Sequence, residues 1–300
     1  PRRLSMPGAD APAGAIYDLG YRTYDGPRLG RRAAVLALYT FTLRGAFGIG
    51  RRTSAKIVPL VVAAFAFIPA LIQLGVAALL GSRIEIIAPW NYLGYSEVPV
   101  ALFCAGVAPE IFGRDLRYRT LSLYFSRALL RTDYAVAKTA AFVTALAVLT
   151  LGPLLLLTIG NGLASDDLPG YLADHWREFP QSLAAGLVIA AVAGCGSLAI
   201  AAHAPRRAYA TVGVAAWFLV TLPLAGILVE IGGEVGRFAA WFSPFDLLYG
   251  AALAIFGHTP GADSIQARAD LPPFTYLLLA AAHLGAAALL ILRRFQRVQA

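Results

Sequence analysis

The stretch AVAKTAAFVTALAVLTLGPLLLLTIG, residues 135–160, decides the fold class because it is an almost uninterrupted apolar run long enough to cross a bilayer. A membrane-spanning helix needs roughly 20 apolar residues to cross a hydrocarbon core of about 30 Å. The composition agrees, since 58% of the 300 residues are hydrophobic and only 14% are charged, against about a quarter in a soluble domain. Five further stretches qualify as spans: 57–80, 92–113, 182–202, 208–229 and 274–292. We therefore predict an all-α polytopic membrane protein, with six transmembrane helices in a single transmembrane domain over residues 1–300.

The distribution of charge predicts the orientation. If both termini are cytoplasmic, 21 of the 25 basic residues fall in the inner segments, which then carry a net charge of +15, against −7 for the outer segments. Such an excess of cations inside is typical of membrane proteins. The first thirty residues lack the apolar stretch of a signal peptide. We expect cytoplasmic tails at 1–30 and 293–300, on either side of a six-span bundle over 57–292.

Two apolar segments are not expected to cross the membrane. Residues 31–56 contain an apolar run of only eleven residues flanked by arginines, which favours a helix at the inner interface. If residues 238–256 crossed, the arginine-rich C-terminus would lie outside and Asp246 would lie at mid-bilayer. We predict instead outer re-entrant or interfacial helices between spans five and six, with their break at Ser243, Pro244 and Phe245.

Several chemistries are disfavoured by absent motifs. Lys56 and Lys138 both follow alanine, so no Gly-Lys-Ser/Thr loop is present to bind ATP phosphates. Cys104 and Cys195 lie singly in apolar runs, and the histidines lack metal-ligand spacing. The cations line one membrane face without interleaved aromatics, so nucleic acid is not expected as a partner. We predict no catalytic residues, no metal and no cofactor on this chain, and therefore no enzyme activity of its own.

An arginine-rich segment, residues 114–134, separates the second and third spans. On a helical wheel, residues 120–131 form an amphipathic helix. Its apolar face carries Leu121, Tyr124, Phe125, Ala128 and Leu129. The opposite side carries Ser122, Ser126, Arg127 and Arg131 around a small ridge of Leu123 and Leu130. From the residues alone, this helix either docks a cytoplasmic partner or simply pairs its arginines with membrane lipid.

The run APEIFGRDLRYRTLSLYFSRALLRTDYAVAK, residues 108–138, resembles the segment between the second and third spans of type 2 ATP-binding-cassette (ABC-2) exporter permeases. Ser243 to Leu248 resembles the outer segment before that family's last span, and residues 16–32 resemble actinobacterial members. Ala128 stands where the family often has proline. The matching positions are Pro109, Glu110, Arg114, Asp115, Leu121, Leu123, Ser126, Arg127, Arg131, Tyr134 and Lys138.

The resemblance implies that residues 120–131 are a coupling helix, which docks on a separate ATPase subunit carrying ATP and Mg. It also implies two ATPase copies, a second permease subunit that is identical or homologous, and a multi-pass location in a bacterial plasma membrane. Phe125, Arg127 and Arg131 would be hot spots, since aromatic and arginine residues dominate such interfaces. The docking residues would be Leu121, Leu123, Tyr124, Phe125, Ser126, Arg127, Leu130 and Arg131.

Two acids near the ends of the second span invite separate hypotheses. Glu110 is four residues before Arg114, and an i,i+4 ion pair there would pin the span to the coupling helix; a solvated acid is the alternative. Glu97 lies at the outer end, where it lines a solute pathway or sits among lipid headgroups. An ion-gradient-driven secondary transporter and a non-transporting membrane scaffold remain alternative functions.

Overall fold

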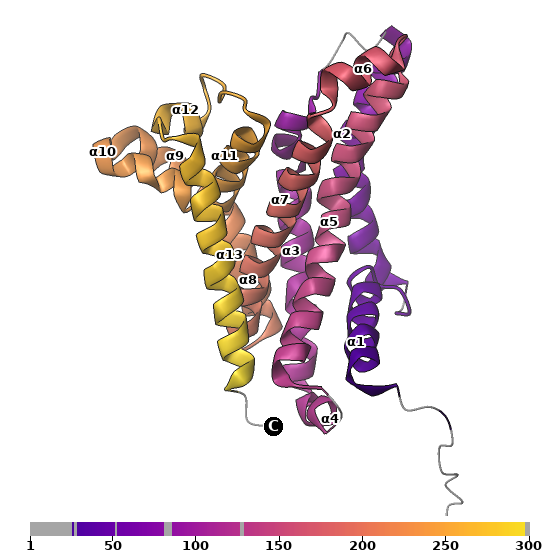
Figure 1. Cartoon of the computed structure of the whole chain (residues 1–300). Helices are drawn as coiled ribbons and strands as arrows, with labels where there is room; N and C mark the ends of the chain where they lie inside the picture. The colour runs from indigo at the N-terminus through magenta and orange to yellow at the C-terminus, as the bar shows by residue number, and fades with distance from the viewer. Residues whose placement is uncertain (1–25, 27–28, 52, 81–85, 127–128, 298–300) are drawn as a thin grey trace, which may run out of the picture.

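The computed structural model describes residues 26, 29–51, 53–80, 86–126 and 129–297, and within these ranges every regular element is a helix (Figure 1). The predicted all-α class is therefore confirmed. The helices are α1 (Gly30–Ala46), α2 (Ser54–Leu80), η1 (Pro89–Asn91), α3 (Tyr92–Arg117), α4 (Leu121–Phe125), α5 (Arg131–Leu163), α6 (Leu168–His175), α7 (Glu178–His203), α8 (Arg207–Leu219), α9 (Thr221–Ile231), α10 (Gly233–Gly236), η2 (Arg237–Trp241), α11 (Pro244–Phe256), α12 (Ile265–Ala269) and α13 (Pro273–Gln296).

Six segments are long and apolar enough to cross a membrane, at the positions that the hydrophobic runs predict. They are α2, η1 with α3, α5, α7, α8 with α9, and α13. Most extend a few residues beyond the predicted spans, because helix geometry continues into polar flanks that hydropathy excludes. The chain thus has the architecture of a multi-pass helical membrane protein.

The bundle has two distinct ends. One end, called the α4 end below, holds α1, α4 and the end of α13, and the other, the α6 end, holds α6, α10 and α12 (Figure 1). At the α4 end, basic residues outnumber the acids Glu110, Asp115 and Asp133. These basic residues are Arg31, Arg32, Arg44, Arg51, Lys56, Arg114, Arg117, Arg119, Arg131, Lys138, Arg206, Arg207, Arg293, Arg294 and Arg297.

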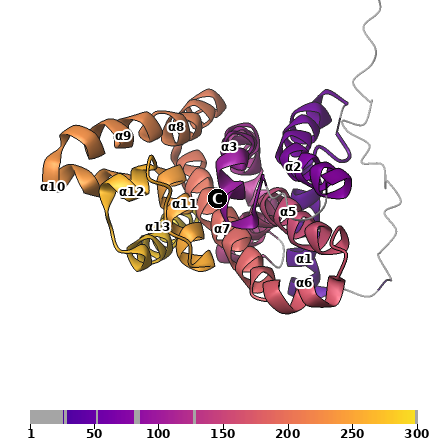
Figure 2. The same cartoon turned by 90° about the horizontal axis from the view of Figure 1, so that it is seen from above.

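The packed centre consists of α5 and α7, which share the most extensive helix contact. Viewed along the bundle, α3 lies beside them while α2 and the α8–α9 pair occupy the periphery (Figure 2). Small residues allow the close approach, as is common where membrane helices pack. At Gly186 of α7, a Cβ would lie 3.2 Å from the Cα of Leu151 in α5. Cys104 and Cys195 are buried in this core, as small apolar residues would be.

The predicted fifth span is interrupted. Helix α8 ends at Leu219 and α9 begins at Thr221, and α9 leads away from the bundle toward α10 (Figures 1 and 2). Pro223 explains the break, because it has no N–H to bond the carbonyl one turn earlier and its ring crowds that turn. Thr221 Oγ1 donates a hydrogen bond back to the carbonyl of Trp217 at the same point.

Between this segment and α13, the chain turns back at the α6 end. The segments Gly233–Trp241 and Pro244–Phe256 bend by 81° at their break. Ser243 caps α11 by accepting from the backbone N–H of Asp246, and Pro244 occupies the first helical turn. Helix α13 then starts at this same end (Figure 1). This arrangement is compatible with the predicted re-entrant pair of helices, and by length and composition a broken seventh crossing fits as well.

Helix α1 is shorter than the predicted helix over 31–56. It ends at Ala46, and the following turn contains Gly48 and Gly50 with positive φ values of 71° and 81°. Only glycine adopts such angles readily, so the helix cannot continue there. The hydrogen bond from Tyr39 Oη to Thr144 Oγ1, 2.9 Å, and an ion pair of Arg31 with Asp133 show that α1 runs alongside the first half of α5.

Candidate functional site

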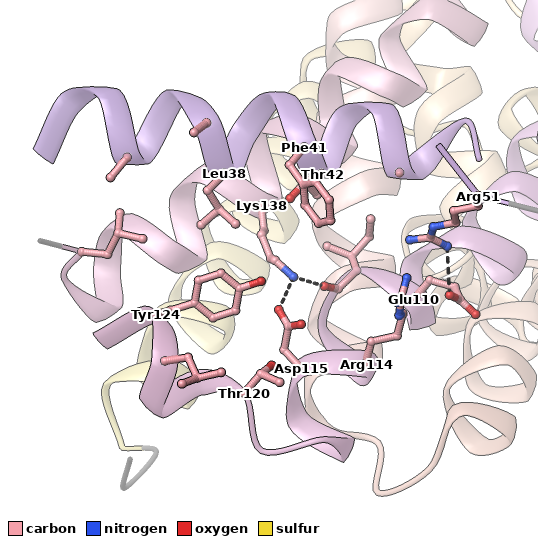
Figure 3. Close-up of a pocket in the computed structure, with 16 residues that line it drawn as sticks. Leu38, Phe41, Thr42, Arg51, Glu110, Arg114, Asp115, Thr120, Tyr124 and Lys138 are labelled. Carbon is pink, nitrogen blue, oxygen red and sulfur yellow. Dashed lines mark hydrogen bonds and ion pairs between the residues drawn. The ribbon is translucent and has the colours of Figure 1, made fainter. Parts of the chain in front are cut away.

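A cavity of about 590 Å³ opens at the α4 end between α1, the end of α3, α4 and the start of α5 (Figure 3). We call it the α1–α4 cavity. Its wall is mostly apolar, with charged groups from α3 and α5 on one side. The lining residues are Ala34, Ala37, Leu38, Phe41, Thr42, Gly45, Arg51, Glu110, Ile111, Arg114, Asp115, Thr120, Leu123, Tyr124, Leu129 and Lys138.

A buried ion pair forms the floor of this cavity. Lys138 is only 6% exposed, and its Nζ donates to Asp115 Oδ2 at 2.5 Å and to the carbonyl of Ile111 at 2.6 Å. Tyr134 Oη donates to the same Asp115 Oδ2 at 2.7 Å. Because Asp115 comes from α3 while Lys138 and Tyr134 come from α5, the pair ties the two helices on either side of α4 together (Figure 3).

An aromatic cluster extends this connection to α4 and α13. The ring of Tyr134 lies 5.4 Å from Tyr124, 5.9 Å from Phe125 and 5.2 Å from Phe295, centroid to centroid. Phe112 and Phe295 are 4.6 Å apart. Burial raises the pKa of the Tyr124 phenol, and the nearby Asp115 carboxylate raises it further. Helix α4 is therefore fixed to α3, α5 and α13 through ring contacts.

The predicted coupling helix over 120–131 is wrong in its extent. Helix α4 covers only Leu121–Phe125, and Arg131 is the first residue of α5. The reason is local capping: Asp133 accepts a hydrogen bond from the backbone N–H of Leu130 at 3.0 Å, which starts a new helix there. A side-chain acceptor at this position competes with continuation of the preceding helix.

The predicted docking residues divide into two groups. Leu121 is 5% exposed, and Tyr124 and Phe125 are half-buried, so these three face the bundle. Leu123 and Leu130 are 67% and 54% exposed, but they do not stack as a ridge on one helix, because Leu130 lies beyond the end of α4. Ser126 and Arg131 are also exposed, and Arg131 donates to the carbonyl of Gln296 at 3.0 Å. Arg127 lies outside the described residues.

Glu110 has other partners than the predicted Arg114. Its carboxylate bonds Arg207 Nη1 at 2.6 Å and Arg51 Nη1 at 3.2 Å, and in the described structure no ion pair joins it to Arg114. Arg114 instead lines the α1–α4 cavity. The turn after α1 and the start of α8 bring Arg51 and Arg207 to Glu110 from far away in the sequence. The ion pair thus joins three segments rather than one helix to itself.

Arg31 and Asp133 form a two-pronged ion pair that holds α1 against α5. Arg31 Nε and Nη2 each donate to Asp133 at 2.7 Å. These hydrogen bonds raise the pKa of the Arg31 guanidinium. Paired, parallel hydrogen bonds fix geometry as well as charge. Asp133 therefore caps α5 and positions one wall of the cavity at the same time.

The sequence did not single out Asp115, Tyr134 and Lys138 as a site, nor Arg51 and Arg207 as partners of Glu110. One usable signal exists for the first group. Lys138 is a cation inside an apolar run, and Tyr134 precedes it by one helical turn. A buried lysine requires an anionic partner, which directs attention to Asp115. Nothing in the sequence near Glu110 indicates that Arg51 or Arg207 is its partner.

The predicted residues at the other end lie apart from this cavity. Ser243 and Pro244 start α11, and Phe245 is 1% exposed with its ring 5.0 Å from that of Phe218. Phe245 thus anchors the re-entrant pair to α8. Glu97 lines a separate cavity of about 540 Å³ between α3 and α11.

Neither the models of known protein families nor the curated proteins give a match to this chain. The fold and the site define its class as a multi-pass α-helical membrane protein with a short anchored helix at the basic end.

Proposed function

We propose that the chain is the permease subunit of an ABC-2-type exporter, which forms half of a translocation pathway and is driven by a separate ATPase subunit through α4. The observation that carries the proposal is the two-sided character of α4. Its inner side is anchored by Leu121 and the rings around Tyr134, whereas Leu123, at the mouth of the α1–α4 cavity, is 67% exposed. Exposed apolar side chains such as Leu123 and Leu130 on a rigid support suit a protein partner.

The anchoring supports a mechanical role. A helix that transmits motion to a bundle must be held rigidly where it contacts that bundle. Here the aromatic cluster around Tyr134 connects α4 to α5 directly and to α3 and α13 through the Tyr134 ring. The ion pair of Asp115 with Lys138 joins α3 to α5. A displacement of α4 would therefore move these helices together, because packed interfaces shift between discrete arrangements rather than deform continuously.

The remaining parts of the proposal follow from charge and from missing motifs. The basic α4 end would face the cytoplasm, in accordance with the positive-inside tendency. The chain has no phosphate-binding loop, so ATP and Mg would bind two copies of the partner subunit. A second permease subunit, identical or homologous, would complete the pathway in a bacterial plasma membrane. Anionic lipid would meet the basic rim.

Site-specific photo-crosslinking tests this proposal. A benzophenone amino acid would replace Leu123 in the full chain in its native cells, with Leu163, 70% exposed at the α6 end, as the matched control position. We expect position 123, and not 163, to crosslink a polypeptide that contains a phosphate-binding loop. Crosslinking of position 123 to lipid alone would contradict the proposal.

A further inference from the structure

A second cavity, the α3–α11 cavity, lies at the α6 end and has a different chemistry from the α1–α4 cavity. Its volume is about 540 Å³, within the range of small-molecule sites. It lies between the start of α3, the first turns of α11 and the segment that leads into α12. The lining residues are Asn91, Gly94, Tyr95, Glu97, Asp246, Tyr249, Asp263, Ser264, Ile265, Gln266 and Arg268.

Acidic side chains outnumber basic ones in the lining of this cavity. Glu97, Asp246 and Asp263 line it, against the single cation Arg268. Arg268 is already engaged, since its Nη1 pairs with Glu230 and its Nη2 donates to the carbonyl of Asp263 at 3.0 Å. Among the residues that the structure describes, neither Glu97 nor Asp246 has a cationic partner. The cavity thus presents two acidic side chains that no basic residue of the described chain pairs with.

Asp246 is the most informative residue of this cavity. It is 5% exposed, and its Oδ1 accepts from Gln266 Nε2 at 3.3 Å, while its Oδ2 has no hydrogen-bond partner in the described part of the chain. A buried carboxylate oxygen without a partner is unfavourable and calls for an explanation. Its place in the first turn of α11 gives partial compensation from the helix dipole, but this does not supply a donor to Oδ2.

The remaining wall groups favour an organic cation. Tyr95 is 47% exposed, and Tyr249, half-buried, lies one turn after Asp246. Aromatic faces attract cations, and quaternary ammonium groups are recognised by aromatic rings together with negative charge. Within the described residues, no cluster of three or more His, Cys, Asp or Glu side chains is arranged to hold a metal ion. The volume also exceeds what a bare ion needs.

We propose that the α3–α11 cavity binds an organic ammonium ion, with the carboxylates of Asp246 and Glu97 neutralising its charge and the rings of Tyr95 and Tyr249 covering its alkyl groups. Binding at this site requires no ATPase partner. The proposal therefore stands or falls separately from the transport function, although a bound cation that crossed the membrane would define the substrate class of the proposed exporter.

Calorimetric titration of the purified full chain in nanodiscs tests the proposal. The probes are choline, tetraethylammonium and benzyltrimethylammonium, and 3,3-dimethylbutan-1-ol serves as the uncharged counterpart of choline. We expect at least one of the three cations to bind. If choline binds, the uncharged alcohol should bind at least tenfold more weakly than choline. Glu97→Gln should weaken cation binding at least tenfold. Asp246→Asn should do the same.

The matched control is Glu234→Gln, which makes the same change of charge at the same end but on an exposed side chain of α10 outside the cavity. It should leave binding unchanged within twofold. If Asp246→Asn does not fold, Glu97→Gln and Tyr249→Leu decide, since neither removes the capping contacts of α11. Absence of binding by all three cations, equal binding of the alcohol and choline, or equal losses in Glu97→Gln and Glu234→Gln would overturn the proposal.

Discussion

Single residues at the α4 end take part in more than one structural task. Tyr134 hydrogen-bonds Asp115 and centres the aromatic cluster, and Asp133 both caps α5 and holds Arg31. Such shared groups make the effects of mutations non-additive. Pairs of substitutions therefore test the contacts of these residues better than single substitutions do.

The ion pair of Lys138 and Asp115 gives the first prediction. Lys138→Met leaves the Asp115 carboxylate without its cation, and breaking a buried pair in this way typically costs about 3–5 kcal/mol. We expect a loss of about 3 kcal/mol in the free energy of unfolding, measured in detergent. The double variant Lys138→Met/Asp115→Asn should lose less, because no unpaired charge remains.

Lys56→Met serves as its control, since Lys56, the other lysine of the chain, is exposed. It should change the free energy of unfolding by less than about 0.5 kcal/mol. A double variant that is less stable than Lys138→Met alone would show that the pair is not what holds α3 to α5.

The partners of Glu110 give the second prediction. A double-mutant cycle with Glu110→Gln and Arg51→Gln should return a coupling of about 1 kcal/mol, as expected for a half-exposed pair. In a cycle with Arg114→Gln in place of Arg51→Gln, the two changes in the free energy of unfolding should add within about 0.3 kcal/mol. The reason is that Arg114 forms no ion pair with Glu110 in the described structure. Unfolding in detergent measures both. Coupling of Glu110 to Arg114 and none to Arg51 would support the ion pair within α3 that the sequence predicts.

At the scale of elements, the six spans could be predicted closely because a run of about 20 apolar residues leaves a helix in the membrane as the only option. The ends of short helices could not be predicted from hydropathy in the same way. Residues 120–131 have one amphipathic pattern, yet Asp133 divides them by capping α5. The break at Val220 depends on a proline that many membrane helices tolerate. Local capping and distant contacts, such as Arg207 with Glu110, decide details that hydropathy does not contain.

Helix α4 gives the third prediction, from two leucines only two positions apart. Leu121 is 5% exposed and Leu123 is 67% exposed. Leu121→Ala should lower the free energy of unfolding by about 2–3 kcal/mol because it leaves a cavity. Leu123→Glu should change that free energy by less than about 0.5 kcal/mol, yet abolish recovery of the proposed ATPase subunit with the purified chain.

Retained stability is the built-in control of this comparison, because a folded Leu123→Glu variant that loses its partner separates docking from folding. Full recovery of the proposed ATPase subunit with Leu123→Glu would show that Leu123 is not part of a docking surface. Loss of stability in both variants would show instead that Leu123 packs against the chain itself.

At the scale of the whole molecule, the charge asymmetry and the bent pair of helices favour the same topology, with six crossings. Six segments are long and apolar enough to cross, and the bent pair of α10 and α11 returns to the α6 end (Figure 1). With six crossings, α1 and the end of α13 lie together at the basic α4 end. A seventh crossing would separate α4 from the C-terminal arginines. The sequence predicts six crossings from charge, and the 81° bend between Gly233–Trp241 and Pro244–Phe256 is compatible with that prediction.

The fourth prediction tests this topology by cysteine labelling with a membrane-impermeant maleimide in intact cells. Cysteine at Val235 of α10, which is 80% exposed, should react, whereas cysteine at Leu123 or at the exposed Arg297 should react only after the membrane is opened. The native Cys104 and Cys195 are 0% and 5% exposed, so the unsubstituted chain provides the background. Val235 and Arg297 reacting from the same side would mean that α11 completes a crossing. The C-terminal arginines would then lie on the opposite side of the membrane from α4, which would contradict the proposed cytoplasmic docking of α4.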